Sequence, residues 1–270
     1  MAQTFYLLCY RLRSVLLGLS AWLLISPAQA TSYTVVVQNI NYFPIYSANV
    51  DSGHYSGYVR DLLDAFALSE GIQFNYRLRP IRRMMLEYLE GNYDFAVPDN
   101  PNWNLPLKLG RRIHYSQPLL EFTDAVFVRA EDGDLTAAEM KSYGTIAGFT
   151  PWKFREPIAR GELQLETAPN PTSLIQMLLN GRVDTINLAL PVAQFHFQAL
   201  RVEDQLVAAP QLLPIETSRY YMSTLRHPEV IQRLNAFMER EAALVAELRA
   251  RYRLGPFHEP VTELREPDGP

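Results

Sequence analysis

The sequence contains a single cysteine, Cys9, among its 270 residues. This residue lies in an N-terminal segment that we expect to be removed, so the mature chain would contain no cysteine. Such a chain forms no disulfide, offers no thiolate nucleophile and holds no metal through a thiolate.

Long apolar runs are missing beyond the first 30 residues. The run from Val15 to Ile25 follows Arg11 and Arg13 and precedes Ala28-Gln29-Ala30, which has the small-x-small form of a cleavage site. A membrane span needs about 20 apolar residues, so the segment is typical of a secretory signal peptide. The alternative is an uncleaved N-terminal anchor. We expect cleavage after Ala30 and a periplasmic chain of 240 residues.

Positive charge is also in short supply. The formal net charge is −4, and without the two leader arginines 23 basic residues face 29 acidic ones, a net charge of −6. Sequence-independent binding to nucleic acid depends on neutralising phosphates with basic side chains. We therefore expect no nucleic-acid partner.

Motifs for catalysis and for cofactors are absent from the sequence. There is no G-x-S-x-G, Walker loop or dinucleotide fingerprint. None of the five histidines forms a metal-ligand pair with a neighbour in the sequence. No pair of carboxylates can be placed from spacing alone. We predict no catalytic residue, no metal and no cofactor. The five histidines are His54, His114, His196, His227 and His258.

Strand and helix patterns alternate along the mature chain. The strand patterns are short and apolar, and the helix patterns carry apolar residues three and four positions apart, with glycine closing several of them. Strands are predicted over 33–38, 72–78, 93–97, 123–129, 183–188 and 220–224, with a further strand beginning at Thr145. Helices are predicted over 58–69, 81–90, 172–180 and 228–252. The stretch 98–110 has no clean periodicity and is predicted to be a loop.

One short pattern, a helix followed by Leu-x-Gly-x-x-Asp and a strand, occurs twice. It reads Leu89-Glu-Gly-Asn-Tyr-Asp94 in the first half and Leu179-Asn-Gly-Arg-Val-Asp184 in the second. Two similar α/β lobes would produce this echo. Because the second unit interrupts the first, the chain would cross between the lobes twice and form a hinge. Ligands of such sheets bind at the carboxyl ends of the strands.

The predicted fold class is therefore α/β, with two mixed or parallel sheets flanked by helices and a hinge of two crossing segments. The chain divides into a signal peptide, the first part of lobe 1, lobe 2, a return segment with the C-terminal helices of lobe 1, and a mobile tail. Their predicted ranges are 1–30, 31–125, 126–217, 218–255 and 256–270.

Aromatic residues and polar loops are the candidate ligand-binding groups. Aromatic rings form flat walls in small-molecule sites, although each ring also fits ordinary core packing. These rings are Tyr42, Phe43, Tyr46 and Tyr58. A guanidinium on the first turn of a helix is unfavourable for the helix dipole, so Arg82 or Arg83 implies an anionic partner, with a solvated surface pair as the alternative.

Further candidates lie in loops at strand ends. One loop offers polar groups and an indole, and the stretch 148–152 precedes a helix whose free amides suit a carboxylate. These candidates are Asp99, Asn100, Trp103, Thr150, Trp152 and, at the end of the next strand, Asn187.

The run from 57 to 129 resembles the first lobe of the bacterial extracellular solute-binding proteins of family 3, the type II periplasmic binding proteins. The likeness is carried by Gly57-Tyr-Val-Arg-Asp-Leu-Leu, Pro80-Ile-Arg-Arg and Ile113-His-Tyr-Ser-Gln-Pro-Leu, and it extends over most of 33–255. It implies a monomer that captures a small polar, amino-acid-like or carboxylate ligand between two lobes and delivers it to an ABC permease by hinge closure.

Two ligand-binding positions of that family depart from its pattern. Leu109 stands where the family's carboxylate-binding arginine is expected, so Lys108 or Arg111 would have to replace it. Ala189 stands where the family places an aspartate for the ligand's ammonium group. Both departures weaken the case for a plain α-amino acid.

Two other functions remain open. The periplasmic cyclohexadienyl dehydratases are similar to these binders, and a lyase of that kind would use an acid such as Glu121 or Asp99. A third possibility is a ligand-presenting partner of a membrane sensor. The sequence does not separate presentation to a sensor from transport.

Overall fold

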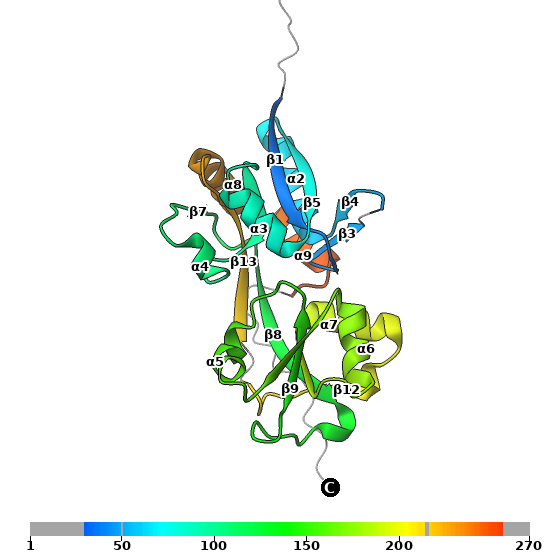
Figure 1. The fold of residues 1–270 in the computed structure, drawn as a ribbon. Coiled ribbons are helices and arrows are strands. Elements are labelled where there is room, and N and C mark those ends of the chain that lie inside the picture. Colours follow the sequence, from blue (N-terminus) through cyan, green and yellow to red (C-terminus); the bar gives the residue numbers. More distant parts are fainter. Residues whose placement is uncertain (1–29, 50, 214–215, 256–270) are drawn as a thin grey trace, which may run out of the picture. The chain divides into compact units, whose positions relative to one another are not determined.

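The computed structural model describes residues 30–49, 51–213 and 216–255 (Figure 1). Its main sheet has ten strands. Eight of them follow the order β10-β9-β11-β8-β13-β6-β1-β5, while β12 pairs with β8 and β7 pairs with β13. The small sheet has the order β2-β3-β4. The strands are β1 (Thr31–Gln38), β2 (Asn41–Tyr42), β3 (Tyr46–Asn49), β4 (His54–Ser56), β5 (Ile72–Arg79), β6 (Phe95–Asp99), β7 (His114–Tyr115), β8 (Leu120–Arg129), β9 (Ser142–Ile146), β10 (Gln164–Ala168), β11 (Thr185–Ala189), β12 (Leu206–Ala208) and β13 (Glu216–Thr224).

Helices flank this mixed sheet. The α-helices are α2 (Tyr58–Glu70), α3 (Ile81–Leu89), α4 (Leu105–Lys108), α5 (Arg155–Ala159), α6 (Pro171–Leu179), α7 (Leu190–Leu200), α8 (Pro228–Arg240) and α9 (Ala242–Arg251). Short 3₁₀ turns are η2 (Ala130–Asp132), η3 (Trp152–Phe154) and η4 (Glu203–Gln205). The predicted α/β class with mixed sheets is confirmed.

The first half of the fold is built around β1 and β6, which pair in parallel. Helix α2 buries its apolar stripe, including Leu62 and Phe66, and ends at Gly71 in the left-handed conformation that glycine adopts without strain. Helix α3 buries Met84 and Met85. These helices lie where the sequence pattern predicts them.

The second half repeats this arrangement around β9, which pairs in parallel with β10 and β11. Helix α6 begins after Asn170, whose side chain accepts a hydrogen bond from the backbone N–H of Ser173. Helix α7 and strand β10 were not predicted. Helix α7 begins directly at the end of β11, and no polar cap or glycine separates the two elements in the sequence.

Strands β8 and β13 join the two halves. They pair antiparallel, from Glu216 opposite Asp124 to Tyr220 opposite Leu120, and β13 continues onto β6. Figure 1 shows both strands running from one half to the other. The predicted lobe boundaries at 125/126 and 217/218 fall inside these strands, and the boundaries themselves stay predictions. The predicted signal peptide and the tail at 256–270 lie outside the described residues, apart from Ala30.

The repeated Leu-x-Gly-x-x-Asp pattern forms the same local structure twice. Asp94 accepts hydrogen bonds from the backbone N–H and the hydroxyl of Thr34, both at 2.8 Å. Asp184 accepts from the backbone N–H of Ser142 at 2.8 Å and from its hydroxyl at 3.0 Å. Each aspartate therefore ties the strand that follows it to a neighbouring strand of the same half, and the sequence echo has a structural cause.

Two sequence predictions need correction. The predicted loop at 98–110 contains the end of β6 and the short helix α4. The predicted helical region at 228–252 is two helices, because the chain departs from helical geometry at Glu241, with φ −101° and ψ 33°. Its apolar periodicity runs through this break, so periodicity alone predicts one element.

Candidate functional site

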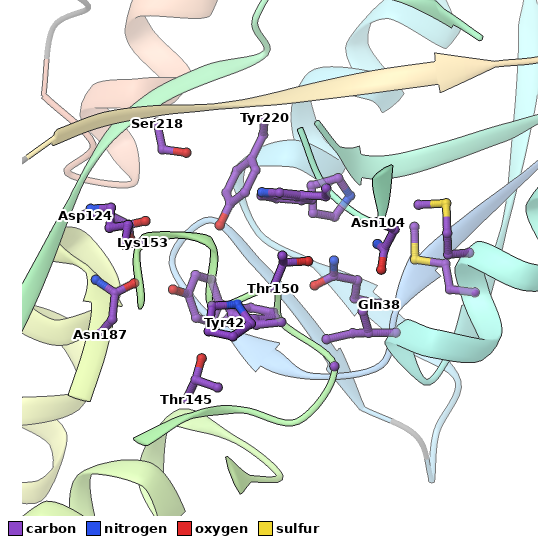
Figure 2. Close-up of a pocket in the computed structure, with 18 of the residues that line it drawn as sticks. Gln38, Tyr42, Asn104, Asp124, Thr145, Thr150, Lys153, Asn187, Ser218 and Tyr220 are labelled. Atoms are coloured by element: carbon purple, nitrogen blue, oxygen red, sulfur yellow. The ribbon is translucent and has the colours of Figure 1, made fainter. Parts of the chain in front are cut away.

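A cavity of about 770 Å³, counting the part open to solvent, lies between the two halves of the sheet. Figure 2 shows labelled side chains from β1, β8, β9, β11 and β13 converging on it. Its lining combines aromatic and apolar walls with a few polar groups, as expected for a small-molecule site. The lining residues used below are Gln38, Tyr42, Ile81, Trp103, Asn104, Phe122, Asp124, Tyr143, Thr145, Gly148, Phe149, Thr150, Lys153, Asn187, Ser218 and Tyr220.

Tyr42 forms the wall contributed by the first half. Its ring stacks on Tyr46, with centroids 5.4 Å apart, and meets Phe149 edge-on across the cavity. Its hydroxyl accepts a hydrogen bond of 3.1 Å from the backbone N–H of Ala189, at the end of β11. The Tyr46 hydroxyl donates to Oε1 of Gln38 at 2.6 Å, which orients that side-chain amide. Tyr42 therefore links the two halves directly beside the cavity.

The two crossing strands contribute a second aromatic wall. Tyr220 on β13 packs against Phe122 on β8, with ring centroids 4.3 Å apart, and Trp103 meets Tyr220 edge-on at 5.5 Å. Ser218 and Asp124 lie on the same strands and also line the cavity. A ligand in the cavity would thus touch the strands that connect the lobes.

Asp124 gives this part of the cavity its negative charge. Burial raises the pKa of Tyr42, Tyr143 and Tyr220 far above the ordinary value, and the charge of Asp124 raises each of them further. The three hydroxyls therefore stay protonated. They can donate hydrogen bonds to a ligand or to the carboxylate itself.

The second half supplies polar groups at the opposite wall. The side-chain amide of Asn187 donates to the Ala125 carbonyl oxygen at 2.9 Å, which leaves its own oxygen as an acceptor. Thr145, Thr150 and Lys153 complete this wall. Among the described lining residues, Asp124 is the one acid and Lys153 the one base, so the site presents both signs of charge within an aromatic enclosure.

The structure brings four of the thirteen predicted ligand-binding residues to the cavity: Tyr42, Trp103, Thr150 and Asn187. Three other predicted aromatic residues pack elsewhere. Tyr46 stacks behind Tyr42, while Tyr58 is fully buried and donates a hydrogen bond to the Leu119 carbonyl. Phe43 faces the rings of Phe195 and Tyr252.

Asp99, Asn100 and Lys108 form a buried polar cluster behind the cavity wall. Asp99 is 0% exposed, and the Lys108 ammonium group donates to its Oδ1 at 2.6 Å and to the Asn100 carbonyl at 2.7 Å. The Ser223 hydroxyl donates to Oδ2 of Asp99 at 2.7 Å. These residues fix the segment that carries Trp103, and none of them lines the cavity.

The predicted cationic residues also lie outside the lining. Arg111 is exposed and donates a hydrogen bond to the Leu89 carbonyl. The Arg83 side chain is 68% exposed and pairs with Glu87 one helical turn later. This arrangement fits the alternative of a solvated residue at the surface. The backbone of Trp152 lies in η3, and its side chain lies outside what the structure describes. Helix α5, which follows it, has only five residues.

Replacing Arg83 by alanine is expected to change the titration of Glu87 and to leave ligand affinity unchanged. Hydrogen bonds from Tyr93 and then Arg83 lower the pKa of Glu87 to about 2. Any stability that the lowered pKa contributes is present above the ordinary pKa and is lost as the pH falls towards 2. The variant should raise this pKa, as measured by carboxylate NMR titration. A weakened affinity in calorimetry would instead place Arg83 in the site.

Sequence reasoning missed the charged pair of the lining and most of its second aromatic wall. Asp124 directly precedes the apolar run Ala125–Val128 of β8, which is a signal that the sequence offers. Lys153, Tyr143, Tyr220 and Gln38 carry no comparable signal, because their approach to the cavity depends on how the two halves pack. Among the described residues, no cluster of histidine, cysteine, aspartate or glutamate could hold a metal ion. No helix there is long and apolar enough for a membrane span.

Comparisons with known proteins were made by sequence and by structure. No protein-family model and no curated protein sequence matches the chain. A histidine kinase sensor domain with similarity to periplasmic binding proteins aligns over 82% of this chain and 95% of its own, with 21% identity and a TM-score of 0.65.

Two further solved structures align comparably. An ancestral amino-acid-binding protein, a precursor of cyclohexadienyl dehydratase, covers 82% of this chain and 95% of its own at 15% identity, with a TM-score of 0.63. An ABC-transporter substrate-binding protein from Streptococcus pneumoniae with bound histidine covers 82% and 92% at 17% identity, with a TM-score of 0.65. Likeness at this level of identity concerns the fold, and on that ground the chain has the two-lobed fold of the periplasmic binding proteins.

Proposed function

We propose that the protein is a periplasmic solute-binding protein that captures a small polar ligand, amino-acid-like or carboxylate, between its two lobes. The observation that supports this most directly is the cavity between the halves, with one acid, one base and aromatic walls. A zwitterion or a carboxylate matches that set of charges, and the rings cover its apolar part. The predicted signal peptide and the fold fit capture of a ligand for an ABC permease, and we expect the protein to work as a monomer.

The proposal is tested by screening ligands against the purified protein. Amino acids, opines and small carboxylates should each be added in a thermal-shift assay, with hits measured by calorimetry. A ligand that binds only the folded protein raises its apparent stability as its concentration exceeds the dissociation constant. Small-angle scattering should then show a smaller radius of gyration with the ligand. A broad panel with no shift and no change in scattering would contradict the proposal.

Asp124→Asn is expected to weaken binding of the best ligand by about tenfold or more, because hydrogen bonds to a charged group contribute roughly 1.5–3 kcal/mol. The matched control is Glu121→Gln, three residues earlier on the same strand. Glu121 pairs with Arg219 and lies outside the lining. Calorimetry should show near-unchanged affinity for the control. Equal affinities for the two variants would remove Asp124 from the site.

Presentation of the ligand to a membrane sensor is the second candidate function. It is favoured by the likeness to a histidine kinase sensor domain. Both roles need the same cavity, so ligand binding does not separate them. Crosslinking in the native cells, with identification of the captured membrane protein as a permease or a sensor kinase, distinguishes the two.

We propose binding without turnover rather than a lyase, although Asp124 is an acid that lines the cavity. The two acids considered for a dehydratase, Glu121 and Asp99, are engaged with Arg219 and Lys108 and do not line the cavity. The aligned ancestral precursor of such an enzyme is itself a binding protein. Turnover of prephenate or arogenate by the purified protein would contradict this reading.

A further inference from the structure

Three exposed leucines lie close together in the segment that follows β6. Leu105 and Leu107 are on helix α4 and are 50% and 42% exposed, and Leu109, just after the helix, is 87% exposed. None of them belongs to a hydrophobic cluster of the described residues. The chain turns at Gly110, whose φ is 74°, and continues into further exposed residues. Leu105 and Leu107 are two positions apart and do not share one face of α4. Exposed apolar side chains concentrated in one short segment still favour an interaction site.

Positive charge borders these leucines. Arg111 and Arg112 are exposed and form no ion pair among the described residues, although one guanidinium nitrogen of Arg111 donates to the Leu89 carbonyl. Together with the three leucines they define the leucine–arginine surface: Leu105, Leu107, Leu109, Arg111 and Arg112.

The neighbouring helix adds to this charge. Helix α3, which contacts α4, adds the exposed Arg82 and Arg83. Two acids on or beside α3 oppose them: Glu87 is shared by Arg79 and Arg83, and Glu90 is exposed. The one lysine of the segment, Lys108, is buried on Asp99. The surface is therefore locally positive on a chain whose net charge is −4.

We propose that the leucine–arginine surface docks on an anionic phospholipid membrane. Leucine side chains that enter the boundary between headgroups and acyl chains, with basic side chains against lipid phosphates, are the standard means of peripheral membrane attachment. The energetic centres of protein interfaces are enriched in tryptophan, tyrosine and arginine, and leucine is under-represented there. The apolar members of this surface are all leucines, which favours lipid over a protein partner.

The position of the surface connects docking to the cavity. Trp103 and Asn104, which line the cavity, directly precede Leu105. The Lys108–Asp99 pair fixes the segment to the sheet between the two regions. A membrane bound at the surface would lie next to the cavity wall formed by this segment. Figure 1 shows α4 at the periphery of its half of the fold.

The test is co-sedimentation of the full protein with vesicles of phosphatidylcholine, with or without about 30% phosphatidylglycerol. We expect binding to the anionic vesicles, weakening as salt is added because exposed charges are screened. The paired change Leu105→Ser and Leu109→Ser should reduce the partition coefficient about tenfold or more. Arg111→Ala and Arg112→Ala should reduce it about fivefold for each arginine removed.

Leu68→Ser is the matched control, because Leu68 is 85% exposed on α2 and lies outside the surface. It should leave vesicle binding unchanged. All variants share the same N-terminal segment, so their differences report the surface alone. Equal binding by the leucine pair and the control would overturn the proposal. Binding to native membranes without binding to vesicles of their extracted lipids would also overturn it, by identifying a membrane protein as the partner, as would self-association lost in the leucine variant.

Discussion

Lys108→Met is expected to lower the free energy of unfolding by about 3–5 kcal/mol, the typical cost of removing one partner of a buried ion pair. The substitution leaves the Asp99 carboxylate, which is 0% exposed, without its cation, and it removes the donor to the Asn100 carbonyl. Urea unfolding followed by circular dichroism measures the change. Because this segment carries Trp103, ligand affinity should fall as well.

Two controls separate this cost from general effects of losing a lysine. Lys141→Met removes an ammonium group that donates only to the Ala138 carbonyl at the surface, and it should change the unfolding free energy by less than about 0.5 kcal/mol. The double variant Asp99→Asn with Lys108→Met removes both charges and should recover part of the loss. A stability of Lys108→Met equal to that of the wild type, with affinity alone reduced, would return Lys108 to the role of a ligand-binding residue.

Gly148→Ala is expected to weaken ligand binding about 10- to 100-fold, with a smaller effect on stability. Gly148 belongs to the loop after β9 in the second half, and a Cβ built on it would lie 2.9 Å from Cβ of Ile81 on α3 in the first half. Its φ of 93° is also strained for any residue with a side chain. The added methyl group would hold the two walls of the cavity apart. Calorimetry gives the affinity, and scattering with and without ligand gives the closure.

Gly53→Ala provides the comparison for backbone strain alone, because Gly53 has a φ of 67° and no heavy atom within 4 Å of a built Cβ. This variant should lose some stability and keep its affinity. If Gly148→Ala bound and closed like the wild type, the contact with Ile81 would not limit approach of the lobes.

Local patterns were sufficient to predict most of the first half of the fold. The apolar stripe of α2 and the end of the helix at Gly71 depend only on residues close together in the sequence, so a local pattern predicts both. Helix α7 was missed because it begins directly at the end of β11, where Pro191 is its start signal, and its many apolar residues form no narrow stripe. Strand pairing between β8 and β13 joins residues nearly a hundred positions apart, which no local window contains.

Site residues were harder to predict for the same reason. Tyr42 and Asn187 follow from the rule that ligands bind where strands end. Arg83 and Lys108 were chosen for their charge, but the nearest opposite charges lie within their own half, on Glu87 and Asp99. A cation is neutralised by whichever carboxylate the fold places beside it. That choice is made by packing, which residue type does not reveal.

The aromatic wall formed by Phe122 and Tyr220 lies on the two strands that every movement between the lobes must bend. Bending these strands would change the shape of the cavity itself. The width of the bound solute and the angle between the lobes would therefore be coupled. A solute that is too wide would then be excluded by the resistance of β8 and β13 to bending as much as by any single contact. Variants that stiffen β8 or β13 should consequently alter selectivity among solutes of different width.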